Sequence, residues 1–219
     1  SGAKSGLIPL FKEPEIIFQA LDYYQPDFVH FCDLLSPFPN DQAIVARNFD
    51  TLLSLQSAVK DCFPKIAIMR SLSAPRAGVS QTDEIQKNIL SFAGLFAPSA
   101  DYFLIDTVIG SPAGQSNQPV AGYVGITGEV CDWDIAQAII TASPIPVILA
   151  GGISGENVFE AITALKPAGV DSCTKTNAVD KQGRPVRFEK DMQKVRRLVE
   201  EARRADVFIR EREDLRFKI

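Results

Sequence analysis

Residues able to do chemistry stand where the short apolar runs of this chain end. The run Tyr102–Ile105 leads directly into Asp106, and a segment rich in Gly, Ser and Pro follows. Asp106 is either a turn residue that closes a strand or a carboxylic acid at the mouth of a site, where it would transfer protons. Other runs end in the same way, at Cys32–Asp33, Arg70–Ser71, Gly151–Gly152 and Thr174–Lys175.

Two of these junctions and one further loop carry residues suited to binding a phosphate. In "LAGGISGEN", Gly151 and Gly152 precede a helical pattern, so that backbone N–H groups can approach an anion. The segment "CTKTN" adds the hydroxyl of Thr174 and the cation Lys175, and "GITGEVCDW" adds Gly128. Glycines are also common in plain strand-to-helix turns, so each segment taken alone fits either reading.

The elements that must position these residues are strands alternating with helices. Apolar runs lie near residues 6–11, 27–33, 65–71, 102–106, 146–152 and 169–174. Helical patterns lie near 13–24, 41–61, 82–96, 133–140, 154–165 and 189–205. Such alternation predicts a parallel sheet, and continuous apolar strands indicate that helices cover the sheet.

A doubly wound open sheet and a (β/α) barrel both have this alternation. An open sheet binds its ligand in a crevice at one switch point, so few strand ends should carry chemistry. Barrels build their sites from many strand ends, and the loops after the last two strands often share one phosphate. We therefore expect an α/β fold of the (β/α)8 TIM-barrel type, as one domain over residues 1–219.

The composition narrows the class of protein. The chain has 219 residues, 46% of them hydrophobic, with a net charge of −4. No basic stripe suggests a nucleic-acid partner, and no apolar run approaches the roughly 20 residues that span a bilayer. The four cysteines form no CxxC pair, which predicts free thiols in the cytoplasm, with no metal and no cofactor.

Several candidates have ordinary structural explanations. Cys32 and Cys173 are more often small buried apolar residues than nucleophiles or bases. His30, the single histidine, falls inside an apolar run, where core packing is the expectation. Arg70 fits a salt bridge as well as a substrate contact.

Three blocks of the sequence resemble phosphoribosylanthranilate isomerase, a (β/α)8 barrel of tryptophan biosynthesis. They are "FLIDT…GYVGITGEVCDW", "PVILAGGISGENVFEAI" and "GVDSCTKTN…G…FEKDMQKVRRLVEEAR". The resemblance covers about residues 100–205 well and the preceding region weakly. It implies an aldose–ketose isomerase, an intramolecular oxidoreductase, that rearranges a small phosphoribosyl amine by Amadori chemistry.

The resemblance also implies residue roles. Asp106 falls on the family's general acid, which protonates the ribose ring oxygen. The phosphate loops fall on Gly151, Gly152 and the segment from Cys173 to Lys175, and Asp171 falls on the Asp of the last strand. We expect phosphate binding by Gly128, Gly151, Gly152, Thr174 and Lys175, and substrate binding by Arg70 and Asp171.

The chain departs from the family pattern at the catalytic base. The Lys-Ile-Cys-Gly-like motif that carries the family's catalytic thiol does not occur, so Cys32 or Cys173 is the candidate thiol, and neither position matches. The family's Gly-Gly-Thr-Gly reads Gly125-Ile126-Thr127-Gly128 here, and its Ser-Gly-Val-Glu reads Thr174-Lys175-Thr176-Asn177.

The run at residues 6–11 aligns with the family's third strand, so six units are visible where a closed barrel has eight. The barrel is either completed by residues outside this chain or by a partner, and its open edges predict a homodimer. Three functions stay open: the isomerase, a repurposed barrel that binds a phosphosugar without catalysis, and another phosphosugar isomerase or lyase.

Overall fold

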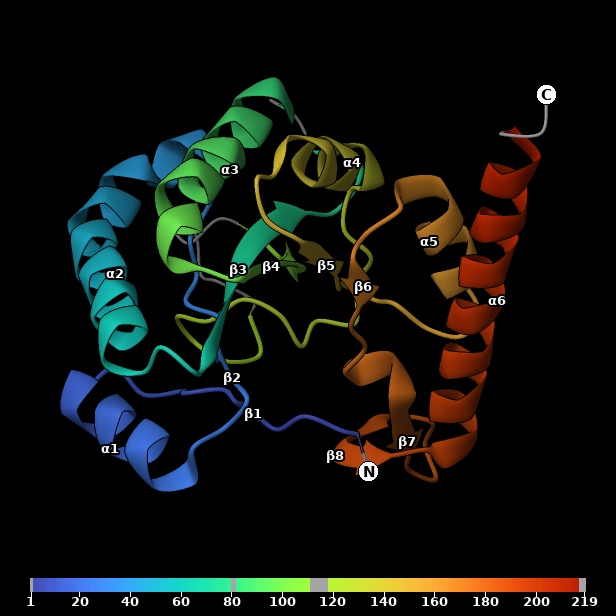
Figure 1. The fold of residues 1–219 in the computed structure, drawn as a ribbon, viewed down its shortest axis with the longest axis horizontal. Helices are drawn as coiled ribbons and strands as arrows, with labels where there is room; N and C mark the ends of the chain where they lie inside the picture. The colour runs from blue at the N-terminus through green and yellow to red at the C-terminus, as the bar shows by residue number, and fades with distance from the viewer. Residues whose placement is uncertain (1, 80–81, 111–117, 217–219) are drawn as a thin grey trace.

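A curled sheet of six parallel strands forms the centre of the molecule (Figure 1). The computed structural model describes residues 2–79, 82–110 and 118–216. Spatial order follows chain order through β1 (Gly6–Leu7), β2 (Phe28–Phe31), β3 (Ala67–Pro75), β4 (Tyr102–Val108), β5 (Val147–Leu149) and β6 (Gly169–Val170). Every neighbouring pair in this sheet is parallel, which confirms the expected α/β class.

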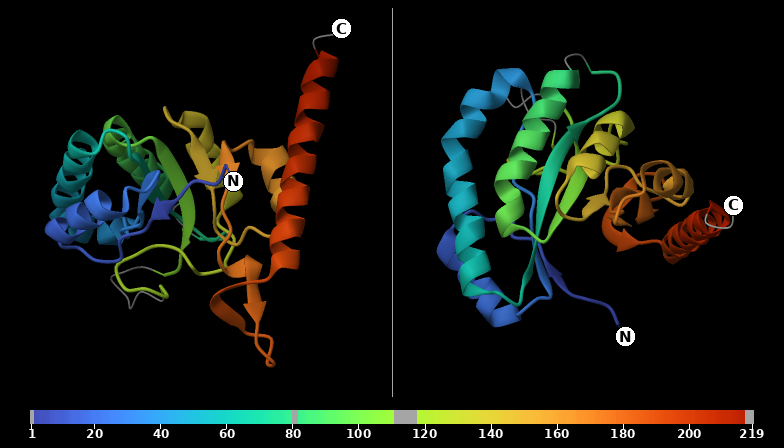
Figure 2. Two further views of the ribbon diagram at one scale, coloured as in Figure 1. Left: turned by 60° about the horizontal axis from the view of Figure 1, so that its bottom comes forward. Right: turned by 45° about the horizontal axis from the view of Figure 1, so that its top comes forward.

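Helices follow the strands and cover the outer side of the curl (Figure 2). They are α1 (Pro14–Tyr24), α2 (Gln42–Cys62), α3 (Thr82–Phe96), α4 (Trp133–Ala142), α5 (Val158–Leu165) and α6 (Met192–Arg216). The carboxylate of Asp132 caps α4 by accepting hydrogen bonds from two backbone N–H groups of its first turn. No helix in the described ranges is long and apolar enough to cross a membrane.

The side chains of β4 alternate between the outer and the inner face of the sheet. Successive residues of a strand point to opposite faces. Phe103 and Ile105 are fully buried in the main core, between the sheet and its helices. Leu104 instead packs with Met69 and Ala150 in a separate cluster. Asp106, two residues after Leu104, therefore lies on the inner side of the curl.

The fold is an incomplete (β/α)8 barrel. Strands β1 and β6 form the two edges of the sheet and are not paired with each other. The six strands of this sheet match the number expected from the sequence.

The segment between β6 and α6 differs from the expectation. It forms a short turn, η3 (Thr174–Thr176), and then an antiparallel hairpin of β7 (Asn177–Val179) and β8 (Pro185–Lys190). The last helix consequently begins at residue 192 rather than near 189. This helix packs mainly against α5 and leaves Met192 exposed.

The loop after β4 crosses the C-terminal ends of its neighbours. Within its described part, Tyr123 forms an isolated bridge with Asp33 beyond β2, and Cys131 forms one with Arg76 beyond β3. The intervening residues, including Gly125 to Gly128, are therefore held over the strand ends on the inner side of the curl.

Candidate active site

Asp106 lies near the C-terminal end of β4 with its carboxyl mostly withdrawn from solvent. Its Oδ1 accepts a hydrogen bond of 2.8 Å from the backbone N–H of Thr107. Burial raises the pKa of Asp106 to about 7; the Thr107 N–H opposes this rise, and the negative charge of Asp171 adds to it. Such a carboxyl is protonated in about half of the molecules near neutral pH, so it can act as a general acid.

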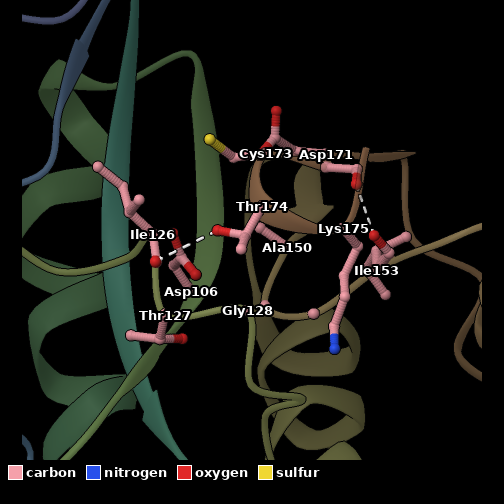
Figure 3. A pocket seen from close by; sticks show the side chains of 13 residues that line it. Asp106, Ile126, Thr127, Gly128, Ala150, Ile153, Asp171, Cys173, Thr174 and Lys175 are labelled. Carbon is pink, nitrogen blue, oxygen red and sulfur yellow. Dashed lines mark hydrogen bonds between the residues drawn. The ribbon is translucent and has the colours of Figure 1, made fainter. Parts of the chain in front are cut away.

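A cavity opens beside Asp106 at the ends of β4, β5 and β6 (Figure 3). It gathers most of the residues that the sequence singled out: Asp106, Gly128, Gly151, Gly152, Asp171, Thr174 and Lys175. These residues come from three separate loops, which supports the expectation that the strand ends share one site.

Two of these loops are joined directly. The hydroxyl of Thr174 donates a hydrogen bond of 3.2 Å to the backbone carbonyl of Ile126 (Figure 3). A side chain added to Gly128 would stand 3.1 Å from the Thr174 methyl, so the loops also touch at this glycine. The loop after β4 and the loop after β6 therefore form one wall of the cavity.

Gly151 and Gly152 form the floor between these loops. Their φ angles are +80° and +63°, a region that residues with a side chain rarely adopt. A Cβ on Gly151 would collide with the Thr107 hydroxyl, and one on Gly152 would stand 2.8 Å from the backbone of Glu129 and Val130. These glycines thus let the loops pack closely, whether or not an anion binds above them.

Ile126 occupies a strained backbone conformation in this wall. Its φ is +61°, which a β-branched residue adopts only at a cost. The strain falls where the family pattern has glycine. The Ile126 side chain lines the cavity next to Asp106.

Lys175 supplies a cation at the edge of the cavity. Its side chain is exposed, and Figure 3 shows its ammonium directed away from Asp171. The Asp171 carboxylate therefore does not neutralise the ammonium.

A second, larger cavity of about 380 Å³ lies on the inner side of the curl and shares Asp106 and Asp171 with the first. It is also lined by His30, Cys32 and Lys190. The two cavities together form one continuous candidate site, with glycine loops at one end and a roomier, more apolar region at the other.

His30 and Cys32 both line this larger cavity, two positions apart along the same segment of chain. The Nε2 of His30 is 2.8 Å from the hydroxyl of Ser71. Burial lowers the pKa of His30 to about 4, with a further contribution from Arg70, so the ring is neutral at pH 7. Burial raises the pKa of Cys32 to about 12, so its thiol keeps its proton.

Arg70 is not part of the site, and its expected role in substrate binding needs correction. It points to the outer side of β3, where it is 0% exposed. Its Nη1 donates to Asp33 at 2.9 Å and its Nε to Gln56 at 2.8 Å, while the guanidinium lies against the rings of Phe31 and Phe96. Arg70 therefore ties the sheet to its helices.

Comparison with known proteins gives the family. The family model for N-(5'-phosphoribosyl)anthranilate (PRA) isomerase matches residues 85–201, more than half of the chain. The chain belongs to the phosphoribosylanthranilate isomerase family. N-(5'-phosphoribosyl)anthranilate isomerase 1 of Methanosarcina mazei is 32% identical over 145 residues, 66% of this chain and 55% of that protein. The chain spans about half the length, or less, of this relative and of three other curated relatives that it matches.

Solved structures of phosphoribosylanthranilate isomerases share the fold. The enzyme from Pyrococcus furiosus superposes with a TM-score of 0.61 at 20% identity, covering 93% of this chain and 76% of that one. A structure described as mutually generated monomers of the dimeric enzyme from Thermotoga maritima has a TM-score of 0.52 at 17% identity, covering 90% and 70%. These likenesses establish the barrel architecture.

One residue of the candidate site was missed in the sequence. Lys190, at the end of β8, donates hydrogen bonds to the carbonyl of Cys173 at 2.7 Å and to side-chain oxygens of Thr176 and Asn177 at 3.0 Å each. It thereby fixes the turn that carries Thr174. Lys190 lies within the third family block, but the resemblance assigned it no role, and the hairpin that positions it was not expected from the sequence.

Proposed function

We propose that this chain is a phosphoribosylanthranilate isomerase-like enzyme of tryptophan biosynthesis, which converts a phosphoribosyl amine into a ketose-type amine. Membership of the family supports the reaction class. The observation that carries the proposal is the placement of Asp106, a carboxyl with a pKa near 7, in the same cavity as the glycine loops.

The loops would hold the substrate by its phosphate. Gly128, Gly151 and Gly152 line the cavity with their backbone, Thr174 offers a hydroxyl, and Lys175 offers a positive charge. A phosphate held there leaves the ribose next to Asp106 and directs the aromatic part towards the larger cavity. The volume of about 380 Å³ is in the range of small-molecule sites.

Asp106 would then open the ribose ring. Its proton passes to the ring oxygen as the C1–O bond breaks, and the lone pair of the anthranilate nitrogen forms the C1=N bond. The products of this step are an open-chain iminium and the Asp106 carboxylate. Burial favours the protonated form of Asp106 before the step, which makes proton donation possible near neutral pH.

The decisive experiment follows the fluorescence of phosphoribosylanthranilate, which is lost on turnover. We expect the full chain to consume it and Asp106→Asn to be slower by a factor of about 100 or more. A wild-type chain that binds ribose 5-phosphate without turnover would instead support a repurposed, non-catalytic barrel. A chain that neither binds nor reacts would contradict both functions.

We further propose that the chain forms a homodimer. The edges β1 and β6 leave unpaired backbone groups, and open edges associate readily. The related Thermotoga maritima enzyme is described as dimeric. Light scattering should give twice the 23.9 kDa of one chain, and a mass of 23.9 kDa would contradict the proposal.

A further inference from the structure

One buried hydroxyl of β3, that of Ser73, has no hydrogen-bond partner among the residues that the structure describes. The residue is 2% exposed. Buried polar groups are nearly always paired, because a buried donor without a partner costs free energy. A protein that keeps such a group in its fold commonly uses it, so we looked at what surrounds this hydroxyl.

The register of the sheet places Ser73 beside Asp106. The two residues are partners in the parallel pairing of β3 with β4, and paired strands lie about 4.8 Å apart. Their side chains also point to the same face. Met69 packs with Leu104 on the inner side of the curl, whereas Leu72 belongs to the outer core. Since side chains alternate along a strand, Ser73 points inward, as Asp106 does.

The carboxyl of Asp106 has one hydrogen-bond donor and capacity for more. Its Oδ1 accepts from the backbone N–H of Thr107, and its Oδ2 receives no donor from the described residues. One donor is enough while the carboxyl is neutral. After the acid has given its proton to the substrate, however, it is a carboxylate mostly withdrawn from solvent, and such a charge needs further donors. The Ser73 hydroxyl is an unengaged donor on the same face.

We propose that the Ser73 hydroxyl donates a hydrogen bond to the Asp106 carboxylate that forms when Asp106 gives its proton to the substrate. The inference rests on the proposed function. The proton that moves is that of Asp106, while Ser73 keeps its own and only rotates its O–H group. Because this hydrogen bond strengthens as the charge develops, it stabilises the transition state more than the ground state. Ser73 thus acts through Asp106, as a positioning residue.

Other titratable groups lie around Asp106, and substitution of Ser73 leaves all of them in place. Of these, Asp171 raises the pKa of Asp106 by its negative charge. Those among the described residues lie beyond β6, on and beyond β2, and in the loop after β4: Asp171, Cys173, Lys190, His30, Cys32 and Cys131. A change in the titration of Asp106 on removal of the Ser73 hydroxyl therefore reports on that hydroxyl.

The test compares wild type with Ser73→Ala and Ser73→Thr in the full chain. Carbon NMR of the Asp106 carboxyl should show a pKa raised by about one unit in Ser73→Ala, because a donor to the carboxylate is lost. Ser73→Thr keeps the hydroxyl and should restore the wild-type value. In turnover of phosphoribosylanthranilate, Ser73→Ala should lower kcat about 10-fold with KM within about threefold. Its loss of kcat at alkaline pH should move upward by the same one unit or so.

Ser99→Ala is the matched control, because it removes a buried hydroxyl that is paired. The Ser99 hydroxyl accepts from Gln56 at 2.9 Å and donates to the carbonyl of Phe96 at 3.3 Å. This control should lower the denaturant midpoint of unfolding and leave kcat and the pKa of Asp106 unchanged. Ser73→Ala removes an unpaired hydroxyl, so its midpoint should equal or exceed that of wild type. A purely structural role for Ser73 would not separate activity from stability in this way.

An Asp106 pKa that is unchanged or lowered in Ser73→Ala would overturn the inference. The same holds if Ser73→Ala loses stability as Ser99→Ala does while its pH profile stays that of wild type, since the hydroxyl would then serve the fold. The NMR titration needs no substrate, so it also separates the two proposals. If wild type has no turnover but the pKa of Asp106 still rises in Ser73→Ala, the hydrogen bond is supported and the proposed function fails.

Discussion

The backbone of Gly125 lies directly against the carboxyl of Asp106. Any side chain at position 125, whose φ is +105°, would collide with Oδ2 of that carboxyl. The loop after β4 therefore closes over Asp106 and withdraws it from water, which is the physical cause of its raised pKa. The loop that covers Asp106 thus sets the pKa of this acid.

Ionisation of Asp106 should make the free energy of unfolding depend on pH. Its folded-state pKa of about 7 lies above the free value of 3.8, so the protonated form stabilises the native state. This contribution is complete below the free pKa and is lost as the pH rises through about 7. Between about pH 4 and pH 8, wild type should lose roughly 2–4 kcal/mol relative to Asp106→Asn. Denaturant unfolding of both proteins at a series of pH values measures this, and parallel curves would contradict it.

Removing the strain at Ile126 should stabilise the protein. Ile126→Gly places glycine at a φ of +61°, and we expect a gain of about 0.5–1 kcal/mol in the free energy of unfolding. The matched control is Thr127→Gly, outside the left-handed region, which should lose about 0.5–1 kcal/mol. Equal losses in both variants would show that the Ile126 side chain contributes more than its backbone strain costs.

Loss of Arg70 should affect stability rather than binding. Arg70→Met leaves the Asp33 carboxylate and the Gln56 amide without their buried partner, which should cost about 3 kcal/mol or more. Arg70→Lys keeps the charge and should cost less. Ribose 5-phosphate affinity, measured by calorimetry under conditions where each variant is folded, should be unchanged. A stable Arg70→Met protein with weakened ribose 5-phosphate binding would show that Arg70 does contribute to substrate binding.

The cation Lys175 should contribute to anion affinity. Lys175→Met is expected to weaken ribose 5-phosphate binding by a factor of about 10, because a charge-assisted contact is lost. The control is Lys181→Met, which removes the same charge from the exposed turn of the β7–β8 hairpin. If both variants weaken binding equally, the effect is one of net charge, and Lys175 does not contact the phosphate.

The strand order and the residues at the strand ends were predictable, because a parallel sheet brings the C-terminal ends of its strands to one edge. Asp106, Asp171 and the glycine loops meet for that reason. The orientation of Arg70 was not predictable, because strands covered on both faces show no apolar–polar alternation to reveal which side chains point inward. The hairpin of β7 and β8 was also missed, since no pattern was assigned to the segment before the helix expected from about residue 189.

The hydrogen bonds of Lys190 belong to the same unpredicted part of the molecule. They join the hairpin to the turn at Thr174–Thr176 across a gap in sequence that carries no periodic pattern. Only the folded arrangement shows that this lysine holds the loop, while the neighbouring Lys175 remains free at the cavity edge.

Turnover of phosphoribosylanthranilate by the full chain tests the proposed function most directly. The substrate is generated in the cuvette, and its fluorescence is followed with wild type and with Asp106→Asn. The proposal predicts rapid loss of fluorescence with wild type, slowed by a factor of about 100 or more in the variant. Persistent fluorescence with wild type, or equal rates for the two proteins, would contradict the role of Asp106 as the general acid.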